Sequence, residues 1–232
     1  QGPIGPDVFI PVAEESGLIV GLTDLVLKRA CDQLRQWQLI DESFADLRIQ
    51  VNLSGRDVAQ AGLTGRISQA LLGAGLQAQH LTLELTENIL MERLETALPM
   101  LEELRGLGVR LSVDDFGTGY SSLAHLSTLP IDSLKVDRSF VRNLSAGSKE
   151  AMVVRGIVQL GQSLGKDVVA EGIETASQFD QLRGMGCRLG QGFLMARPMS
   201  AERITALLVG QQPWTGGVAL PVALNPLATQ LH

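Results

Sequence analysis

The sequence predicts an α/β fold built from repeated strand–helix units, and two observations carry that prediction. Six short segments rich in Val, Leu and Ile are apolar at nearly every position, which is typical of parallel strands covered on both faces. Longer segments of helical period alternate with them. With 232 residues, 45% of them hydrophobic, the chain can bury one sizeable core. Both a doubly wound sheet and a (β/α)8 barrel fit this pattern.

The six expected strands follow one another at intervals that leave room for a helix between neighbours. They span residues 47–52, 81–85, 109–113, 133–136, 167–170 and 188–194. A closed barrel of this kind needs eight strands. If the fold is a barrel, we therefore expect its first two strands to lie upstream of Gln1, where the chain begins without a methionine.

Four segments between these strands have a clear helical period, over residues 23–37, 88–107, 148–164 and 175–185. The last three are each followed by a glycine, which favours the left-handed conformation that closes a helix. Thr175 and Gln178 form a capping-box pattern at the start of the last one. The pattern stops after about Gly210, and residues 211–232 contain no charged residue. We therefore expect one domain over residues 1–210 and a C-terminal tail over residues 211–232.

The composition limits which binding partners and which cellular compartment the chain fits. The net charge is −6 and no run is rich in Lys or Arg, so the chain is a poor candidate for binding duplex nucleic acid. A small phosphate ligand would need metal cations to bind such an acidic protein. Two cysteines make no disulfide framework, no apolar run approaches the ~20 residues that span a bilayer, and no signal peptide opens the chain. We expect a cytoplasmic domain, which an upstream region could still anchor to a membrane.

Polar side chains stand at the points where the expected strands end. In a parallel α/β fold these carboxyl ends converge on one face, which is where active sites form. In strand order the residues are Asn52 and Ser54, Glu84 and Glu87, Asp114 and Asp115, Lys135 and Asp137, Glu171 and Glu174, and Gln191. So many carboxylates on one face would repel one another strongly unless cations bind them.

The chemical type of these side chains predicts which metal binds. None of the three histidines lies at a strand end, and carboxylate and amide oxygens suit Mg²⁺ or Mn²⁺ better than zinc. The adjacent acids Asp114 and Asp115 suit a pair of ions. Two ions roughly 3.5–4 Å apart can stabilise both oxygens of an in-line displacement at phosphorus.

Each part of this cluster also has a plainer interpretation. Asn52 to Ser54 could cap the next helix, Asp114 and Asp115 could form a turn, and Lys135 could extend to the surface. Glu87 and Glu174 could be acids favoured near helix N-termini. The coincidence over five strands makes these interpretations jointly improbable.

An ordered set of motifs covers the chain from its first residues to about Pro198. The motifs are PDVFIPVAE from Pro6, VNLS from Val51, ELTE from Glu84, DDFGTGYSS from Asp114, LKVD from Leu134, AEGIET from Ala170 and GQG from Gly190. In these motifs the chain resembles the EAL domains, a family of phosphodiesterases of cyclic di-GMP. A chance match of the whole ordered set is not credible.

The resemblance implies a (β/α)8 TIM-like barrel in which one strand runs antiparallel. It implies hydrolysis of one phosphodiester of cyclic di-GMP to linear pGpG in bacterial second-messenger signalling. The signature Glu-Ala-Leu, followed closely by Arg, would lie just upstream of Gln1, with its Glu a metal ligand and its Arg on the substrate phosphate. A homodimer and an upstream regulatory or GGDEF domain are implied as partners.

The resemblance also assigns roles to individual residues. Two ions, Mg²⁺ or Mn²⁺, would be bound by Asn52, Glu84, Asp114, Asp115 and Glu171. The catalytic residues would be Lys135, which holds the water or the phosphate, and Glu171, a candidate base. Residues near the substrate would be Ser54, Asp137, Glu174 and Gln191. Glu87 would stabilise the loop that follows Asp115, together with Thr118, Ser121 and Ser122.

Two other functions are weighed against an active phosphodiesterase. A non-catalytic cyclic di-GMP receptor is the main alternative, but such family members usually lose several carboxylates, and this chain keeps every one that it spans. A barrel enzyme that uses Mg²⁺ on another phosphorylated substrate would leave the family resemblance as an accident.

Overall fold

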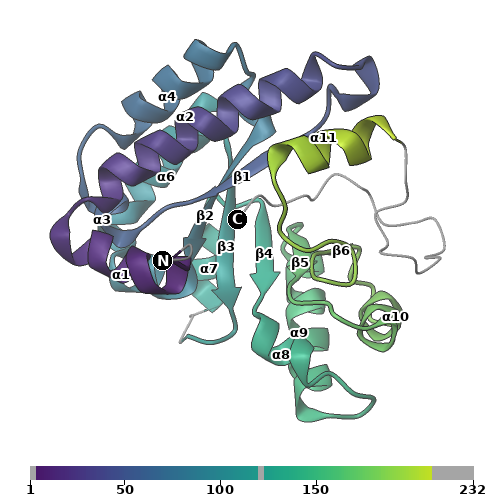
Figure 1. Cartoon of the computed structure of the whole chain (residues 1–232). Coiled ribbons are helices and arrows are strands. Elements are labelled where there is room, and N and C mark those ends of the chain that lie inside the picture. Colours follow the sequence, from purple (N-terminus) through teal and green to yellow (C-terminus); the bar gives the residue numbers. More distant parts are fainter. Residues whose placement is uncertain (1–3, 120–122, 211–232) are drawn as a thin grey trace.

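The computed structural model describes residues 4–119 and 123–210, and its centre is one parallel sheet (Figure 1). Six strands lie in chain order, each paired in parallel with the next. They are β1 (Ile49–Asn52), β2 (Leu81–Thr86), β3 (Arg110–Phe116), β4 (Ser133–Val136), β5 (Asp167–Ala170) and β6 (Leu189–Gly190). The predicted repeat of parallel strand–helix units is confirmed. In the described residues the sheet stays open, with β1 and β6 at its edges, which is consistent with six strands of a TIM-like barrel.

Helices connect successive strands and cover the sheet (Figure 1). They are α1 (Pro6–Ser16), α2 (Ile19–Gln38), α3 (Gly55–Ala59), α4 (Leu63–Ala74), α5 (Glu87–Glu92), α6 (Leu94–Leu107), α7 (Leu123–Thr128), α8 (Arg138–Arg142), α9 (Lys149–Ser163), α10 (Ala176–Gly184) and α11 (Ala201–Val209). Short 3₁₀ turns span Glu42–Phe44 and Ala78–His80. In the described part of the chain, no helix is both long and apolar enough to cross a membrane.

The two faces of the central strands differ in chemistry. Leu83, Leu85 and Leu134 belong to the buried hydrophobic core, which the surrounding helices complete. The alternate positions of β2, β3 and β4 are polar and still buried: Thr82 and Glu84, Ser112, and Ser133 and Lys135. The Ser133 hydroxyl donates to the Ser112 hydroxyl at 2.9 Å, so these positions share one face. A column of polar side chains therefore leads along the inner face of the sheet to its carboxyl end.

Several expected elements differ from the observed ones by a few residues at their ends, and two are wrong in extent by more than that. The helix expected over residues 88–107 is divided at Arg93, whose φ of −129° lies outside the helical range. Buried Leu90 and Leu101 keep the same apolar period on both sides of the break, so the sequence pattern does not reveal it. The strand expected over residues 188–194 pairs only at Leu189 and Gly190, because the chain then folds around Ile173. The tail expected over residues 211–232 lies outside the described residues.

The predicted caps of the later helices are present. Thr175 and Gln178 form a capping box at the start of α10. Gly108, Gly165 and Gly186, which follow the predicted helices, all have positive φ. These glycines close the three helices within one or two residues of the predicted ends.

The burial of both thiols leads to a first prediction. Cys31 in α2 and Cys187 before β6 are free and buried, and burial raises the pKa of each thiol to about 11. Since the thiolate is the reactive form, neither cysteine should react with a disulfide reagent while the protein is folded. Unfolding in guanidinium should expose both thiols to stoichiometric reaction. Fast labelling of either cysteine in the native protein would contradict the burial of its thiol.

Candidate metal and catalytic site

A buried lysine lies at the centre of the candidate site. The Lys135 Nζ atom is 2.6 Å from Glu171 Oε1, 2.8 Å from Glu84 Oε2 and 3.1 Å from Asp114 Oδ1. The side chains of Lys135 and Glu84 are only 1% exposed, so the interpretation of Lys135 as a surface residue is wrong. Four neighbouring strands supply these groups, from β2 to the residue that follows β5. A buried ammonium is tolerable only with such partners.

The surroundings of Lys135 set its charge state. Burial alone would lower the pKa of Lys135, but Glu84, Glu171 and Asp114 raise it above its usual range. Burial raises the pKa of the Glu171 carboxyl to about 7; Asp114 adds to this, and Lys135 opposes it. Lys135 is therefore a fixed positive charge at the carboxyl end of the sheet.

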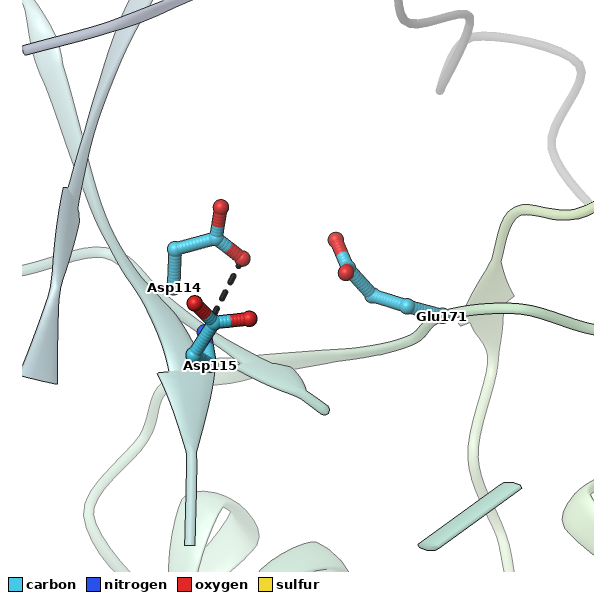
Figure 2. Close-up of side chains that lie close together, drawn as sticks. All are labelled: Asp114, Asp115 and Glu171. Carbon is cyan, nitrogen blue, oxygen red and sulfur yellow. Dashed lines mark hydrogen bonds between the residues drawn. The ribbon is translucent and has the colours of Figure 1, made fainter. Parts of the chain in front are cut away.

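The backbone at Asp115 brings two adjacent acids to one side of β3. Successive residues of a regular strand point to opposite faces. Here the register with β4 shifts between Val113 and Phe116, and Asp115 has a φ of 53°, in the left-handed region. The Asp115 N–H donates to Asp114 Oδ1 at 3.0 Å (Figure 2). As a result, both carboxylates face Glu171 across the same space (Figure 2).

These three carboxylates fit a divalent cation. One oxygen from each of Asp114, Asp115 and Glu171 lies within 4.8 Å of the others. Burial, followed by the charges of Asp114 and Asp137, raises the pKa of Asp115 to about 6. Together with Glu84, this makes four carboxylates around one ammonium. The uncompensated negative charge and the oxygen-only donors suit a hard cation such as Mg²⁺ or Mn²⁺.

Gly190 in β6 and Gly192 just after it allow this segment to pass close to Ile173, which brings Gln191 to the site. A Cβ atom on Gly190 would lie 2.6 Å from Ile173 Cδ1, and one on Gly192 would collide with the Ile173 backbone. The Ile173 N–H donates to the Gln191 carbonyl at 3.0 Å, which fixes the crossing. The Gln191 amide then donates from Nε2 to Glu171 Oε1 at 2.9 Å. Gln191 therefore orients the same carboxylate oxygen that contacts Lys135.

Glu87 contacts the loop that follows β3. Its side chain is buried at the first position of α5, and its Oε2 accepts from the Gly117 N–H at 2.8 Å and the Gly119 N–H at 3.2 Å. The Thr118 hydroxyl donates to the Asp115 carbonyl at 2.8 Å. A Cβ on Gly119 would lie 2.8 Å from Asn88 Oδ1 and 3.0 Å from the Glu87 carboxyl carbon, so a side chain there would push against the Glu87 contact. Ser121 and Ser122 lie outside the described residues.

The remaining expected residues lie around this centre. Asn52 ends β1 with its side chain exposed, in register with Glu84 on β2. Asp137 follows β4 and accepts the Ser139 N–H at 3.0 Å to cap α8. After burial and the charge of Asp114, the charge of Asp137 also raises the pKa of Asp115. Glu174 is exposed in the turn before α10.

Ser54 acts as a helix cap, which is the plainer of the two interpretations given for it above. Its hydroxyl caps α3 in a capping box with Asp57. Asp57 was not among the predicted residues, although the spacing Ser54-x-x-Asp57 is typical of a capping box.

A parallel α/β sheet with acids and a lysine at the carboxyl ends of its strands defines the chain as a barrel-type domain with a candidate divalent-cation site. The family model of the EAL domain matches residues 1–198, and the chain belongs to this family. The fold and the family expected from the motifs are thereby confirmed.

Named relatives are found among bacterial signalling proteins. The chain is 46% identical over 206 residues to "Bifunctional diguanylate cyclase/cyclic di-GMP phosphodiesterase MucR" of Pseudomonas aeruginosa, covering 89% of this chain and 30% of the relative. It is 47% identical over 208 residues to "Cyclic di-GMP phosphodiesterase NbdA" of the same organism, covering 90% of this chain and 26% of the relative. The chain thus spans less than a third of the length of these relatives.

Solved structures share the fold. The MucR phosphodiesterase in complex with c-di-GMP superposes with a TM-score of 0.84 at 46% identity, covering 88% of this chain and 82% of that one. The EAL enzyme Bd1971, with cAMP and cyclic di-GMP bound, gives a TM-score of 0.83 at 33% identity, over 90% of this chain and 57% of that one.

Proposed function

We propose that this domain hydrolyses one phosphodiester of cyclic di-GMP, giving linear pGpG, in a metal-dependent reaction. The observation that carries the proposal is the cluster at the carboxyl end of the sheet, where Lys135 contacts three carboxylates and Asp115 joins them. Relatives at 46% and 47% identity carry the name of cyclic di-GMP phosphodiesterases, which supports this substrate.

The metal would be bound by side-chain oxygens. We assign this role to Asn52, Glu84, Asp114, Asp115 and Glu171, with Mg²⁺ or Mn²⁺ as two ions. When bound, these ions would neutralise charge on the phosphate and make a water more acidic. Asp114 and Asp115 suit this role because the turn at Asp115 aims both carboxylates at one space.

The protein groups supply orientation and charge. Lys135 is held in place by three carboxylates and offers a positive charge to the phosphate or to the attacking water. We assign Glu171, whose Oε1 accepts from the Gln191 amide, as the base that takes the proton from the water. Ser54, Asp137, Glu174 and Gln191 are assigned to the surroundings of the substrate.

We also propose that the domain works as a homodimer in the cytoplasm, joined to a regulatory or GGDEF domain. The much greater length of the named relatives supports an additional domain, and the name of MucR includes a diguanylate cyclase. Two free buried cysteines and the absence of a disulfide framework suit a reducing compartment.

The test of the proposed function is a product assay with the intact protein. Cyclic di-GMP is incubated with Mg²⁺ or Mn²⁺, and pGpG is quantified by chromatography. We expect many molecules of pGpG per chain, and none once a chelator removes the metal. Tight binding of cyclic di-GMP without pGpG would overturn the proposal in favour of a receptor.

Glu87 gives a prediction about the loop after β3. Because Glu87 accepts both the Gly117 and Gly119 N–H groups, Glu87→Ala should release the loop and misplace Asp115. We expect lower activity and a higher Mg²⁺ concentration at half-maximal activity. A first-turn acid contributes only about 0.3–1 kcal/mol of stability through the helix dipole. Glu95→Ala, which removes the exposed first-turn acid of α6, controls for that effect. If both variants reach half-maximal activity at the same Mg²⁺ concentration, Glu87 does not position the loop and only favours the N-terminus of α5.

A further inference from the structure

A further buried carboxylate lies behind the end of β1, outside the cluster around Lys135. Asp57, in α3, is fully buried. Its Oδ2 accepts three hydrogen bonds: from the Ser54 hydroxyl at 2.6 Å, the Ser54 N–H at 2.9 Å and the Thr23 hydroxyl at 3.0 Å. On the other side, Arg66 Nη2 of α4 lies 3.6 Å from Asp57 Oδ1. Asp57 therefore connects α3 to both α2 and α4.

This carboxylate holds the short segment that carries Asn52. The segment is tied to β2 on one side, because the Leu53 N–H donates to the Glu84 carbonyl at 2.8 Å. On the other side Ser54 is held by Asp57. The helix α3 has only five residues, too few to be stable alone, so its position depends on these contacts.

The pair of Asp57 and Arg66 is not an efficient source of folding stability. Asp57 Oδ1 and Arg66 Nη2 are buried and have no hydrogen-bond partner in the described part of the chain. A buried ion pair with unsatisfied atoms is often no better for stability than apolar packing, whereas it can fix geometry. The Arg66 guanidinium is also held by a second carboxylate, because its Nε donates to Asp24 Oδ1 at 2.8 Å.

We propose that Asp57 is a positioning residue for cation binding, held by Thr23 and Arg66. It fixes Ser54, and through it sets Asn52 beside Glu84 at the carboxyl end of the sheet. This inference rests on the proposed function, which makes Asn52 a metal ligand. Changes in the orienting partners of metal ligands commonly weaken metal binding by about 10- to 100-fold.

The experiment measures Mn²⁺ affinity directly, from the electron paramagnetic resonance signal of the free ion titrated against the intact protein. Asp57→Ala removes the oxygen that accepts from Ser54 and Thr23, and should weaken Mn²⁺ binding by about 10-fold or more. Arg66→Met should weaken it in the same direction, and the double variant should lose less than the sum of the two effects, because both act through one contact. Ser148→Ala is the matched control, since it removes a helix cap on α9, away from β1. It should lower the melting temperature without changing Mn²⁺ affinity.

The outcomes distinguish failure of the proposed metal site from failure of the positioning role of Asp57. Failure of the wild-type protein to bind Mn²⁺ would overturn both the metal site and the role of Asp57. Normal Mn²⁺ binding by the wild type, with equal affinity in Asp57→Ala, would overturn the positioning role alone. If Asp57→Ala does not fold, Thr23→Val removes one of the three donors and tests the same point. Unchanged Mn²⁺ affinity in folded Thr23→Val would then count against the proposal.

Discussion

Asp114→Asn should abolish turnover of cyclic di-GMP and leave the fold intact. The Asn side chain has the same shape, and its oxygen can still accept from Lys135 Nζ and from the Asp115 N–H. What disappears is the negative charge that the proposed cations need. Loss of several kcal/mol of transition-state stabilisation corresponds to a fall in kcat on the order of 10³-fold or more.

The control for Asp114→Asn is the same substitution at the opposite end of the sheet. Asp132 precedes β4 and accepts the Leu111 N–H at 2.9 Å. Asp132→Asn should keep kcat near the wild-type value, because this end of a parallel α/β fold serves stability rather than catalysis. Circular dichroism and melting temperature confirm that both variants are folded. Substantial hydrolysis by folded Asp114→Asn in Mg²⁺ would exclude the two-metal role.

Lys135→Ala should lower kcat by several orders of magnitude and change the affinity for cyclic di-GMP much less. The ammonium is a fixed charge whose value grows as negative charge develops on the reacting phosphate, so its loss affects the transition state most. The same substitution removes the ammonium that lies 2.8 Å from the buried carboxylate of Glu84, and breaking one side of a buried ion pair costs about 3–5 kcal/mol. The metal-free variant should therefore melt at a clearly lower temperature, and Mg²⁺ should recover part of the difference.

Lys166→Ala provides the matched control for the loss of a lysine. The Lys166 ammonium donates to the Ile131 carbonyl at 2.6 Å at the amino end of the sheet. Its removal should leave kcat unchanged and give no extra stabilisation by Mg²⁺. Equal losses of kcat and of ligand affinity in Lys135→Ala, or no loss of either, would remove Lys135 from the chemical step.

The sequence predicts the strand order and the clustering of the site because both depend on local patterns. Apolar strands such as residues 133–136 and 167–170 match β4 and β5 residue for residue. Once the strands are parallel, the acids that follow them must share one end of the sheet. The contact between Glu87 and the loop after β3 could also be predicted, because Glu87 directly follows the neighbouring strand β2 and the loop with glycines at 117 and 119 has N–H groups that can donate.

Other features depend on tertiary geometry that no local pattern reveals. Alternation along a strand places Asp114 and Asp115 on opposite faces, and only the left-handed turn at Asp115 brings them together. The burial of Lys135 follows from three carboxylates that come from separate strands. The short β6 results from the approach of Gly190 and Gly192 to Ile173, a contact between segments that pattern analysis treats separately.

Hydrolysis in water enriched with ¹⁸O tests the central claim most directly. The intact protein, cyclic di-GMP and Mg²⁺ or Mn²⁺ are combined in H₂¹⁸O, and the mass of the product is measured. If metal-dependent attack of water opens one phosphodiester, pGpG must carry a single ¹⁸O atom on its terminal phosphate, with no such product in chelator or from Asp114→Asn. Unlabelled pGpG, labelled product in the presence of chelator, or unchanged cyclic di-GMP would each contradict a metal-dependent phosphodiesterase built on Lys135 and its carboxylates.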